Sequence, residues 1–318
     1  MDKIDKAYGC LAGSAVGDAM GMPACFFTRD KIKATYGFIA DFLESSEVTD
    51  DTGEAMIIAE LLIREGEFSS SAFCRDMKSW ALEKKMLESE LIGPSTRKFL
   101  TGLIEGKDTK EGAKTADTNG SAMRAAPIGI RYWSDLELCK KIAAESSAPS
   151  HGSAPAVAAA CAVAVACAVG IRGETSPGKV MDEAILAAEY GEKVGHDIPA
   201  PKVSKRIALA KRIVDENKKN GLPSIIDELV YILGAGMKAY ESIPLSLGVF
   251  YAAKGDPREG ILAAVNAGDD ADTNGSICGA ICGAFKGANA IPLQWIKSIE
   301  GKSGLNFKKT ASLLLNGD

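Results

Sequence analysis

Apolar residues recur every three to four positions along almost the whole chain, the spacing that predicts amphipathic α-helices. Strong helix formers dominate the composition. No alternating run predicts a hairpin, and the best strand candidate, Tyr36–Phe42, is short. The chain is therefore expected to be all-α. The expected helices are Asp5–Met20, Thr52–Arg64, Ser70–Glu83, Ser95–Ile104, Ser121–Tyr132, Leu136–Ser146, Ala154–Ile171, Gly178–Val194, Val203–Lys218, Ser224–Leu233, Ile243–Ala253, Pro257–Ala267, Thr273–Gly287, Pro292–Glu300 and Leu305–Leu315.

Three helical segments are unusually rich in Gly and Ala: "GCLAGSAVGDAMG", "AAACAVAVACAVG" and "GSICGAICGAFKGA". Small residues allow helix backbones to approach closely, so these three helices are expected to pack at the centre of the molecule. No long or low-complexity linker divides the sequence. Residues 1–318 are therefore expected to form a single compact domain.

Charge and composition narrow the class of protein. The net charge of −5 argues against nucleic acid as a partner, and the basic stretch Pro201–Asn220 is interpreted as an exposed helix face. Ala154–Ile171 carries no charge, but it is mostly alanine and lacks aromatic or basic anchors. A buried central helix, rather than a membrane span, is therefore expected.

The cysteines and histidines give little sign of disulfides or zinc. Eight cysteines are scattered without a Cys-x-x-Cys pair, and there are only two histidines, His151 and His196. No signal peptide is recognised before the first expected helix. The expected location is therefore the reducing cytoplasm.

Acidic residues gather at two expected helix starts, in "VTDDTGEAM" and "AGDDADTNGS". One acid and one hydroxyl are what helix capping requires, and capping is the simpler explanation. Adjacent acids exceed that requirement, because like charges repel unless a cation neutralises them. Carboxylates and hydroxyls without thiol or imidazole favour hard cations such as Mg²⁺ or Mn²⁺. The residues concerned are Thr49, Asp50, Asp51 and Thr52, and then Asp269, Asp270, Asp272 and Thr273.

The ordered motifs "GCLAGSAVGDAMGMP", "TDDT", "TNGSAMRAAPIG", a histidine before an Ala-rich helix, and "GDDADTNGSICGAICGA" resemble the ADP-ribosylglycohydrolase family. This family includes relatives of dinitrogenase reductase-activating glycohydrolase. The resemblance runs from about Tyr8 to Gly287. It implies an all-α orthogonal bundle with a centre of two divalent cations, Mg²⁺ or Mn²⁺. The metal positions that it implies are Thr49, Asp50, Asp51, Asp270, Asp272 and Thr273.

The hexapeptide ADTNGS occurs at 116–121 and again at 271–276, but the flanking sequences do not align. The second copy has Asp270 two residues before Asp272, whereas the first has no such companion acid. Glycine and backbone N–H groups in the first copy suit a phosphate or ribose oxygen. By resemblance, the loop of Asn119, Gly120 and Ser121 binds the ADP-ribose moiety.

The sequence leaves two interpretations open for His151 and for Arg124. The resemblance makes His151 a substrate contact, and the alternative is a capping or core histidine. Arg124 faces a phosphate or forms a structural ion pair. Asp18, an acid among small residues, is expected to accept hydrogen bonds from backbone donors. Asp269 stands where the family usually has glycine, so it is expected to face solvent or to support the ligands.

The sequence departs from the family pattern at Cys25, where the family commonly has a glutamate that faces metals and substrate. Glu54 lies three residues after Asp51, on the same side of a helix. Our hypothesis is that Glu54 supplies the missing carboxylate, and the alternative is a solvated glutamate in the first turn. Together with Asp51 and Asp270, Glu54 is a candidate catalytic residue.

The implied chemistry is hydrolysis at the anomeric carbon of an ADP-ribosyl group, with a carboxylate accepting a proton from water. A modified protein is a candidate substrate. The apolar segment "MPACFF" around Cys25 favours two alternatives. These are a hydrolase of a smaller ribosyl compound such as a nucleoside, and an inactive module that binds ADP-ribose.

Overall fold

The computed structural model describes residues 2–89 and 92–316, and this part of the chain is all-α, as predicted. The α-helices are α1 Lys3–Gly21, α2 Arg29–Tyr36, α3 Asp50–Glu65, α4 Ser70–Glu83, α5 Pro94–Ile104, α6 Lys110–Ala113, α7 Gly120–Met123, α8 Ala126–Arg131, α9 Leu136–Ser147, α10 Ala154–Arg172, α11 Pro177–Val194, α12 Val203–Asn217, α13 Leu222–Leu233, α14 Ala239–Ala252, α15 Pro257–Val265, α16 Ala271–Lys286, α17 Leu293–Ser303 and α18 Phe307–Leu315. Three short 3₁₀ helices are η1 Met22–Ala24, η2 Met86–Glu88 and η3 Ala288–Ala290.

Helix α1 lies against α16 along a line of glycines. A Cβ atom added at Gly13 would lie 2.3 Å from the carbonyl oxygen of Gly279, and one added at Gly17 would lie 2.0 Å from that of Gly275. Such distances leave no room for any side chain at these positions. Because Gly13 pairs with Gly279 and Gly17 with Gly275, the helices are antiparallel. The end of α1 therefore lies beside the start of α16.

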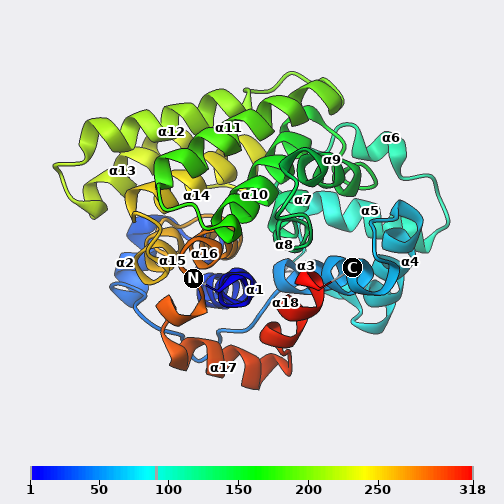
Figure 1. Ribbon diagram of the computed structural model, residues 1–318, viewed down its shortest axis with the longest axis horizontal. Helices are drawn as coiled ribbons and strands as arrows, with labels where there is room; N and C mark the ends of the chain where they lie inside the picture. Colours follow the sequence, from blue (N-terminus) through cyan, green and yellow to red (C-terminus); the bar gives the residue numbers. More distant parts are fainter. Residues whose placement is uncertain (1, 90–91, 317–318) are drawn as a thin grey trace.

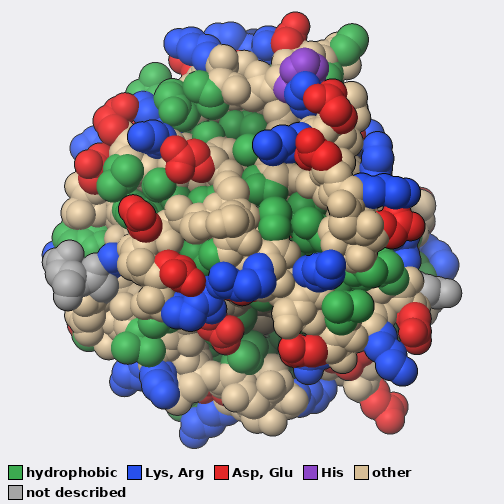
Figure 2. Space-filling view, turned by 90° about the vertical axis from the view of Figure 1, so that its right-hand side faces the viewer, with side chains coloured by type: hydrophobic (Ala, Val, Ile, Leu, Met, Phe, Trp, Pro, Cys, Tyr) green, Lys and Arg blue, Asp and Glu red, His purple; other side chains and the backbone are tan. Residues whose placement is uncertain are grey.

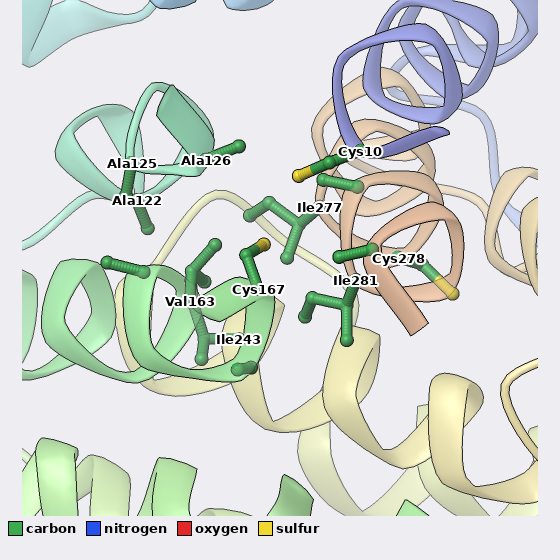
Figure 3. Packing of buried hydrophobic residues seen from close by; sticks show 14 of the residues in the cluster. Cys10, Ala122, Ala125, Ala126, Val163, Cys167, Ile243, Ile277, Cys278 and Ile281 are labelled. Atoms are coloured by element: carbon green, nitrogen blue, oxygen red, sulfur yellow. The ribbon is translucent and has the colours of Figure 1, made fainter. Parts of the chain in front are cut away.

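Figure 1 shows α1 and α16 at the centre, with α10 to α14 on one side and α17 and α18 on the other. In Figure 3, Cys10 from α1, Cys167 from α10, and Ile277 and Ile281 from α16 lie in one cluster. All four side chains are buried. The expected packing of the three Gly/Ala-rich helices at the centre is confirmed.

Helix α10 has the length and composition of a membrane span, but the whole of its apolar window is buried inside the protein. This confirms the prediction of a buried central helix. The basic helix α12 is also as expected, because Ile207, Ala210 and Ile213 are buried while Lys205 and Arg212 are exposed. On the face shown in Figure 2, the described basic and acidic side chains are interspersed and form no continuous basic area.

Two expectations about secondary structure were wrong. The strand candidate Tyr36–Phe42 is not a strand, because the described residues contain no strand, only isolated bridges. Its first residue, Tyr36, instead ends α2, a helix that the sequence did not predict. Gly37, with φ 72°, stops this helix. The helix expected over Ser121–Tyr132 is two short helices, α7 and α8. Pro127 lies in the first turn of α8, where its missing N–H costs no hydrogen bond.

Candidate active site

A cavity of about 130 Å³ lies where the starts of α3 and α16 meet the loop after η1. Further walls come from the start of α5, from α7 and from the segment before α14. The lining residues are Cys25, Phe26, Asp50, Asp51, Ile92, Gly93, Pro94, Thr96, Thr118, Asn119, Gly120, Met123, Met237, Asp270, Asp272 and Thr273.

Asp18, near the end of α1, positions the start of α3. Its carboxylate accepts hydrogen bonds from the backbone N–H groups of Thr49 and Thr52, at 3.0 and 3.1 Å, and from both hydroxyls, at 2.8 and 2.5 Å. This confirms that Asp18 accepts from backbone donors. It also means that the Thr49 hydroxyl is bonded to Asp18, and Thr49 is not among the cavity-lining residues.

The two acidic segments meet inside the cavity. The Thr273 hydroxyl donates to Asp51 Oδ1 at 3.4 Å, across 222 positions of sequence. Asp50, Asp51, Asp270 and Asp272 all line the cavity, and all are buried. The structure thus places the predicted acids side by side, because α1 holds the starts of α3 and α16 together.

The electrostatics of this cluster are unfavourable for four carboxylates alone. Burial, and next the charge of Asp272, raise the pKa of Asp270 to about 8. Burial, followed by the charges of Asp18 and Asp272, raises the pKa of Asp51 well above its usual range. Within the described residues no Lys or Arg forms an ion pair with any of the four. A positive charge in the cavity would therefore stabilise the ionised cluster.

Asp51 Oδ2 gives the most specific indication of a ligand. This oxygen is buried and has no hydrogen-bond partner. As the side chains lie, no group of three His, Cys, Asp or Glu residues in the described ranges is arranged to hold a metal ion. The donors nevertheless fit a hard divalent cation chemically, since they are carboxylate and hydroxyl oxygens.

Asn119 connects the two copies of ADTNGS. Its side-chain amide donates to Asp270 Oδ2 at 2.6 Å and to the Ser242 hydroxyl at 3.0 Å. Ser242 in turn donates to Oδ1 of Asn274, the equivalent residue of the second copy, at 2.9 Å. Gly120 lines the cavity, whereas Ser121 is buried elsewhere and donates to the Ala156 carbonyl. Asn119 therefore positions a carboxylate in addition to its predicted role toward substrate.

His151 lies behind the cavity wall. Its Nε2 is 3.1 Å from the hydroxyl of Thr118, which lines the cavity, and its Nδ1 is 2.8 Å from that of Ser150. A Cβ atom at Gly120 would lie 2.7 Å from the imidazole. Burial, and next the charge of Arg124, lower the pKa of His151 well below its usual range. His151 is thus a neutral core histidine that reaches the cavity through Thr118.

Glu54 requires a correction. It is neither solvated nor part of the cavity wall; it is buried, and its Oε2 accepts from Arg124 Nη1 at 2.5 Å. Arg124 also donates to the Ser150 hydroxyl at 2.7 Å. The structural ion pair expected as one alternative for Arg124 is therefore confirmed. The compensation hypothesis overlooked this arginine, which lies 70 positions away in sequence.

Cys25 lines the cavity beside Asp272, whose pKa burial raises. Burial, and next the charge of Asp272, raise the pKa of Cys25 strongly, which favours the neutral thiol. Asp269 is exposed, as expected, with φ 55°, a conformation that explains why glycine suits this position. Cys25 therefore places a thiol, and not a carboxylate, in the cavity wall.

The apolar segment "MPACFF" supplies Phe26 to the cavity wall, but the sequence did not indicate several other lining residues, namely Ile92, Pro94, Thr96, Thr118, Met123 and Met237. Thr118 lies inside the first ADTNGS, so the repeated hexapeptide could have identified it. Ile92 and Pro94, Met123, and Met237 had no signal in the sequence, because they come from three segments that only the tertiary fold brings to the cavity.

The protein has an all-α fold with buried carboxylates at two adjoining helix starts. Comparison with known proteins gives its family. The ADP-ribosylglycohydrolase family model matches residues 1–317, so the chain belongs to the ADP-ribosylglycohydrolase family. Members of this family are hydrolases of ADP-ribosyl linkages.

Relatives match over almost their full length. An uncharacterized protein of Escherichia coli (strain K12), YegU, is 31% identical, covering 98% of this chain and 97% of that protein. The ADP-ribosyl-[dinitrogen reductase] glycohydrolase of Rhodospirillum rubrum is 22% identical, with coverage of 98% and 96%. A solved structure described as an ADP-ribosylglycohydrolase-related protein complex has a TM-score of 0.71 at 23% identity, with coverage of 99% and 98%. That likeness supports the fold.

Proposed function

We propose that the protein is a metal-dependent hydrolase that cleaves the bond between the anomeric carbon of an ADP-ribosyl group and its leaving group. The family supports the ADP-ribosyl linkage. The observation that carries the proposal is the contact of Asp51 with Thr273, which joins the acidic segments at one cavity.

The proposed cofactors are two divalent cations, Mg²⁺ or Mn²⁺. The uncompensated carboxylates and the unpartnered Asp51 Oδ2 support this proposal. When bound, the cations would supply positive charge that offsets the carboxylates and activates water. Of the six predicted ligands, the five that line the cavity would hold them, namely Asp50, Asp51, Asp270, Asp272 and Thr273, whereas the Thr49 hydroxyl donates to Asp18.

The protein's own residues would orient the sugar and move the proton. Asp51, whose Oδ2 has no donor, would serve as a cation ligand and as the base that accepts a proton from water at different moments. Asn119 fixes the orientation of Asp270 by donating to its Oδ2. The Thr118 hydroxyl donates to Ser95 and lies 3.1 Å from His151 Nε2, so toward a substrate its oxygen would accept a hydrogen bond from a ribose hydroxyl.

The cavity has room for a ribosyl group but not for a whole ADP-ribose. A wider cleft of about 530 Å³ adjoins it, and Pro94 lines both. Two basic and two acidic side chains line this cleft, and Lys107 is paired with Glu105 at 2.8 Å, so Lys98 is the cation there that would be offered to a pyrophosphate. One relative is named an ADP-ribosylarginine hydrolase, and another an ADP-ribosyl-[dinitrogen reductase] glycohydrolase. These names support a modified protein as substrate.

The experiment is turnover on a panel of ADP-ribosylated proteins, O-acetyl-ADP-ribose and nucleosides, with Mg²⁺ or Mn²⁺. Release of a free ribosyl product, abolished by chelation and by Asp51→Asn, is the expected result. Tight ADP-ribose binding without turnover on any substrate would contradict the proposal and would indicate a binding module.

We also propose that the protein is cytoplasmic and forms a single domain. All eight cysteines are free thiols, which suits a reducing compartment. One cluster of buried apolar residues extends from Ala7 to Leu314, which supports a shared core.

A further inference from the structure

Phe26 is an aromatic residue in the wall of the acidic cavity. Its exposed fraction is 63%, and no aromatic ring of the described residues stacks on it. Its neighbour Phe27, in contrast, stacks on Tyr36 at 6.2 Å and lies under the Lys31 ammonium. A single exposed apolar side chain is ordinary on a protein surface. Phe26 differs because its ring lines the cavity that holds the carboxylates.

The backbone of Phe26 is held in an unusual conformation. Its φ is 60°, a region that bulky residues rarely adopt, and the φ of Asp269 is 55°. The Phe26 N–H donates to the Asp269 carbonyl at 2.6 Å, and the Asp269 N–H donates to the Phe27 carbonyl at 2.7 Å. This reciprocal pair fixes Phe26 to the residue directly before Asp270. Strained conformations that the surrounding structure maintains are typical of functional sites.

The side chains that share the cavity wall are carboxylates, large apolar groups, and the uncharged polar groups of Thr96, Thr118, Asn119 and Thr273. The carboxylates belong to the starts of α3 and α16, where the proposed function places the ribose hydroxyls. The other large side chains carry no charge: Phe26, Ile92, Pro94, Met123 and Met237. Cys25, beside Phe26, lines the same cavity. A group on the anomeric carbon would therefore meet an aromatic and aliphatic wall.

We propose that Phe26 forms a stacking surface for a planar heteroaromatic base attached to the anomeric carbon, so that the enzyme accepts N-linked ribosides. This inference rests on the proposed binding of ribose at the carboxylates. Aromatic stacking suits every such base, because each has a π-face, and it requires no countercharge.

The test compares the binding of inosine and of D-ribose by calorimetry, with Mn²⁺ present. Inosine should bind about tenfold more tightly than ribose, the gain expected for one stacked base. Phe26→Ala should abolish this difference and leave ribose binding unchanged, whereas Phe26→Tyr should retain it. Phe38→Ala is the matched control, because Phe38 is 58% exposed and does not line the cavity.

The outcomes separate the two proposals. A Phe26→Ala variant that still prefers inosine tenfold would overturn the stacking role and leave the hydrolase proposal intact. Equal binding of inosine and ribose by the unmodified protein would do the same. Absence of any ribose binding would overturn both.

Discussion

Arg124 Nη1 donates to Glu54 Oε2 at 2.5 Å, and both side chains are almost completely buried. This ion pair begins a chain of hydrogen bonds that continues through Ser150 and His151 to Thr118 in the cavity wall. A charge in the core is thus connected to the candidate site by hydrogen bonds. This chain of hydrogen bonds assigns Glu54 a positioning role toward Thr118.

Glu54→Gln tests that role. Removing one charge of a buried pair leaves the other uncompensated, so the free energy of unfolding should fall by about 3–5 kcal/mol. The folded variant should retain kcat within about tenfold. Urea unfolding and turnover at a temperature where the variant is folded measure the two effects. Glu60→Gln, an exposed change on the same helix, is the control. A loss of kcat above a hundredfold with unchanged stability would restore Glu54 as a catalytic residue.

Thr118→Val tests the end of the hydrogen-bond chain that reaches the cavity. The substitution keeps the shape of the side chain and removes the hydroxyl that bonds His151 and Ser95. A lost hydrogen bond of about 0.5–1.5 kcal/mol predicts a rise in KM of about three- to tenfold. Thr118→Ser should restore the normal value. Thr310→Val, whose hydroxyl bonds only within α18, is the control. An unchanged KM for Thr118→Val would exclude a substrate contact at this hydroxyl.

Gly13→Ala tests the packing of α1 on α16. The added methyl would lie 2.3 Å from the Gly279 carbonyl oxygen, and backbone on both sides leaves little freedom to adjust. Overpacking of this kind should lower the free energy of unfolding by about 1–3 kcal/mol or more. Gly301→Ala, on α17 with nothing within 4 Å, should instead raise it by about 0.5–1 kcal/mol. Equal effects of the two changes in urea unfolding would contradict this account of the core.

His151 predicts a pH dependence of stability. Because its pKa is lowered in the folded protein, the unfolded chain takes up a proton at a higher pH than the folded protein does. The contribution of His151 is therefore complete above about pH 6.5 and declines as the pH falls below it, by at most about 1.4 kcal/mol per pH unit. In urea unfolding between pH 7.5 and 5, His151→Gln should show a smaller decline than the unmodified protein. His196→Gln, an exposed change, should follow the unmodified protein. Identical slopes for all three would show that His151 titrates normally.

The sequence predicted the helices well, because their core-facing periodicity and their caps are local properties. Ser70–Glu83 was predicted with the bounds that the structure shows. The break after Met123 and the helix Arg29–Tyr36 were missed, because short helices depend on tertiary packing more than on periodicity.

The acids of the candidate site could be recognised because their number exceeds what capping needs. Their proximity depends on the antiparallel packing of α1 and α16, which no local pattern specifies. Glu54 was misinterpreted for the same reason, since the position of Arg124 is set by the fold. The apolar character of "MPACFF" pointed to Phe26, but its positive φ could not be read from the sequence.

The central claim is that the segments around Asp51 and Asp272 together bind divalent cations, and Mn²⁺ titration followed by calorimetry tests it most directly. We expect two ions per chain for the unmodified protein and for Asp197→Asn, an exposed control. Asp51→Asn and Asp272→Asn, each on a different segment, should both weaken binding at least tenfold while the fold, measured by circular dichroism, persists. Unchanged Mn²⁺ binding in either of these variants, or no binding by the unmodified protein, would contradict the account.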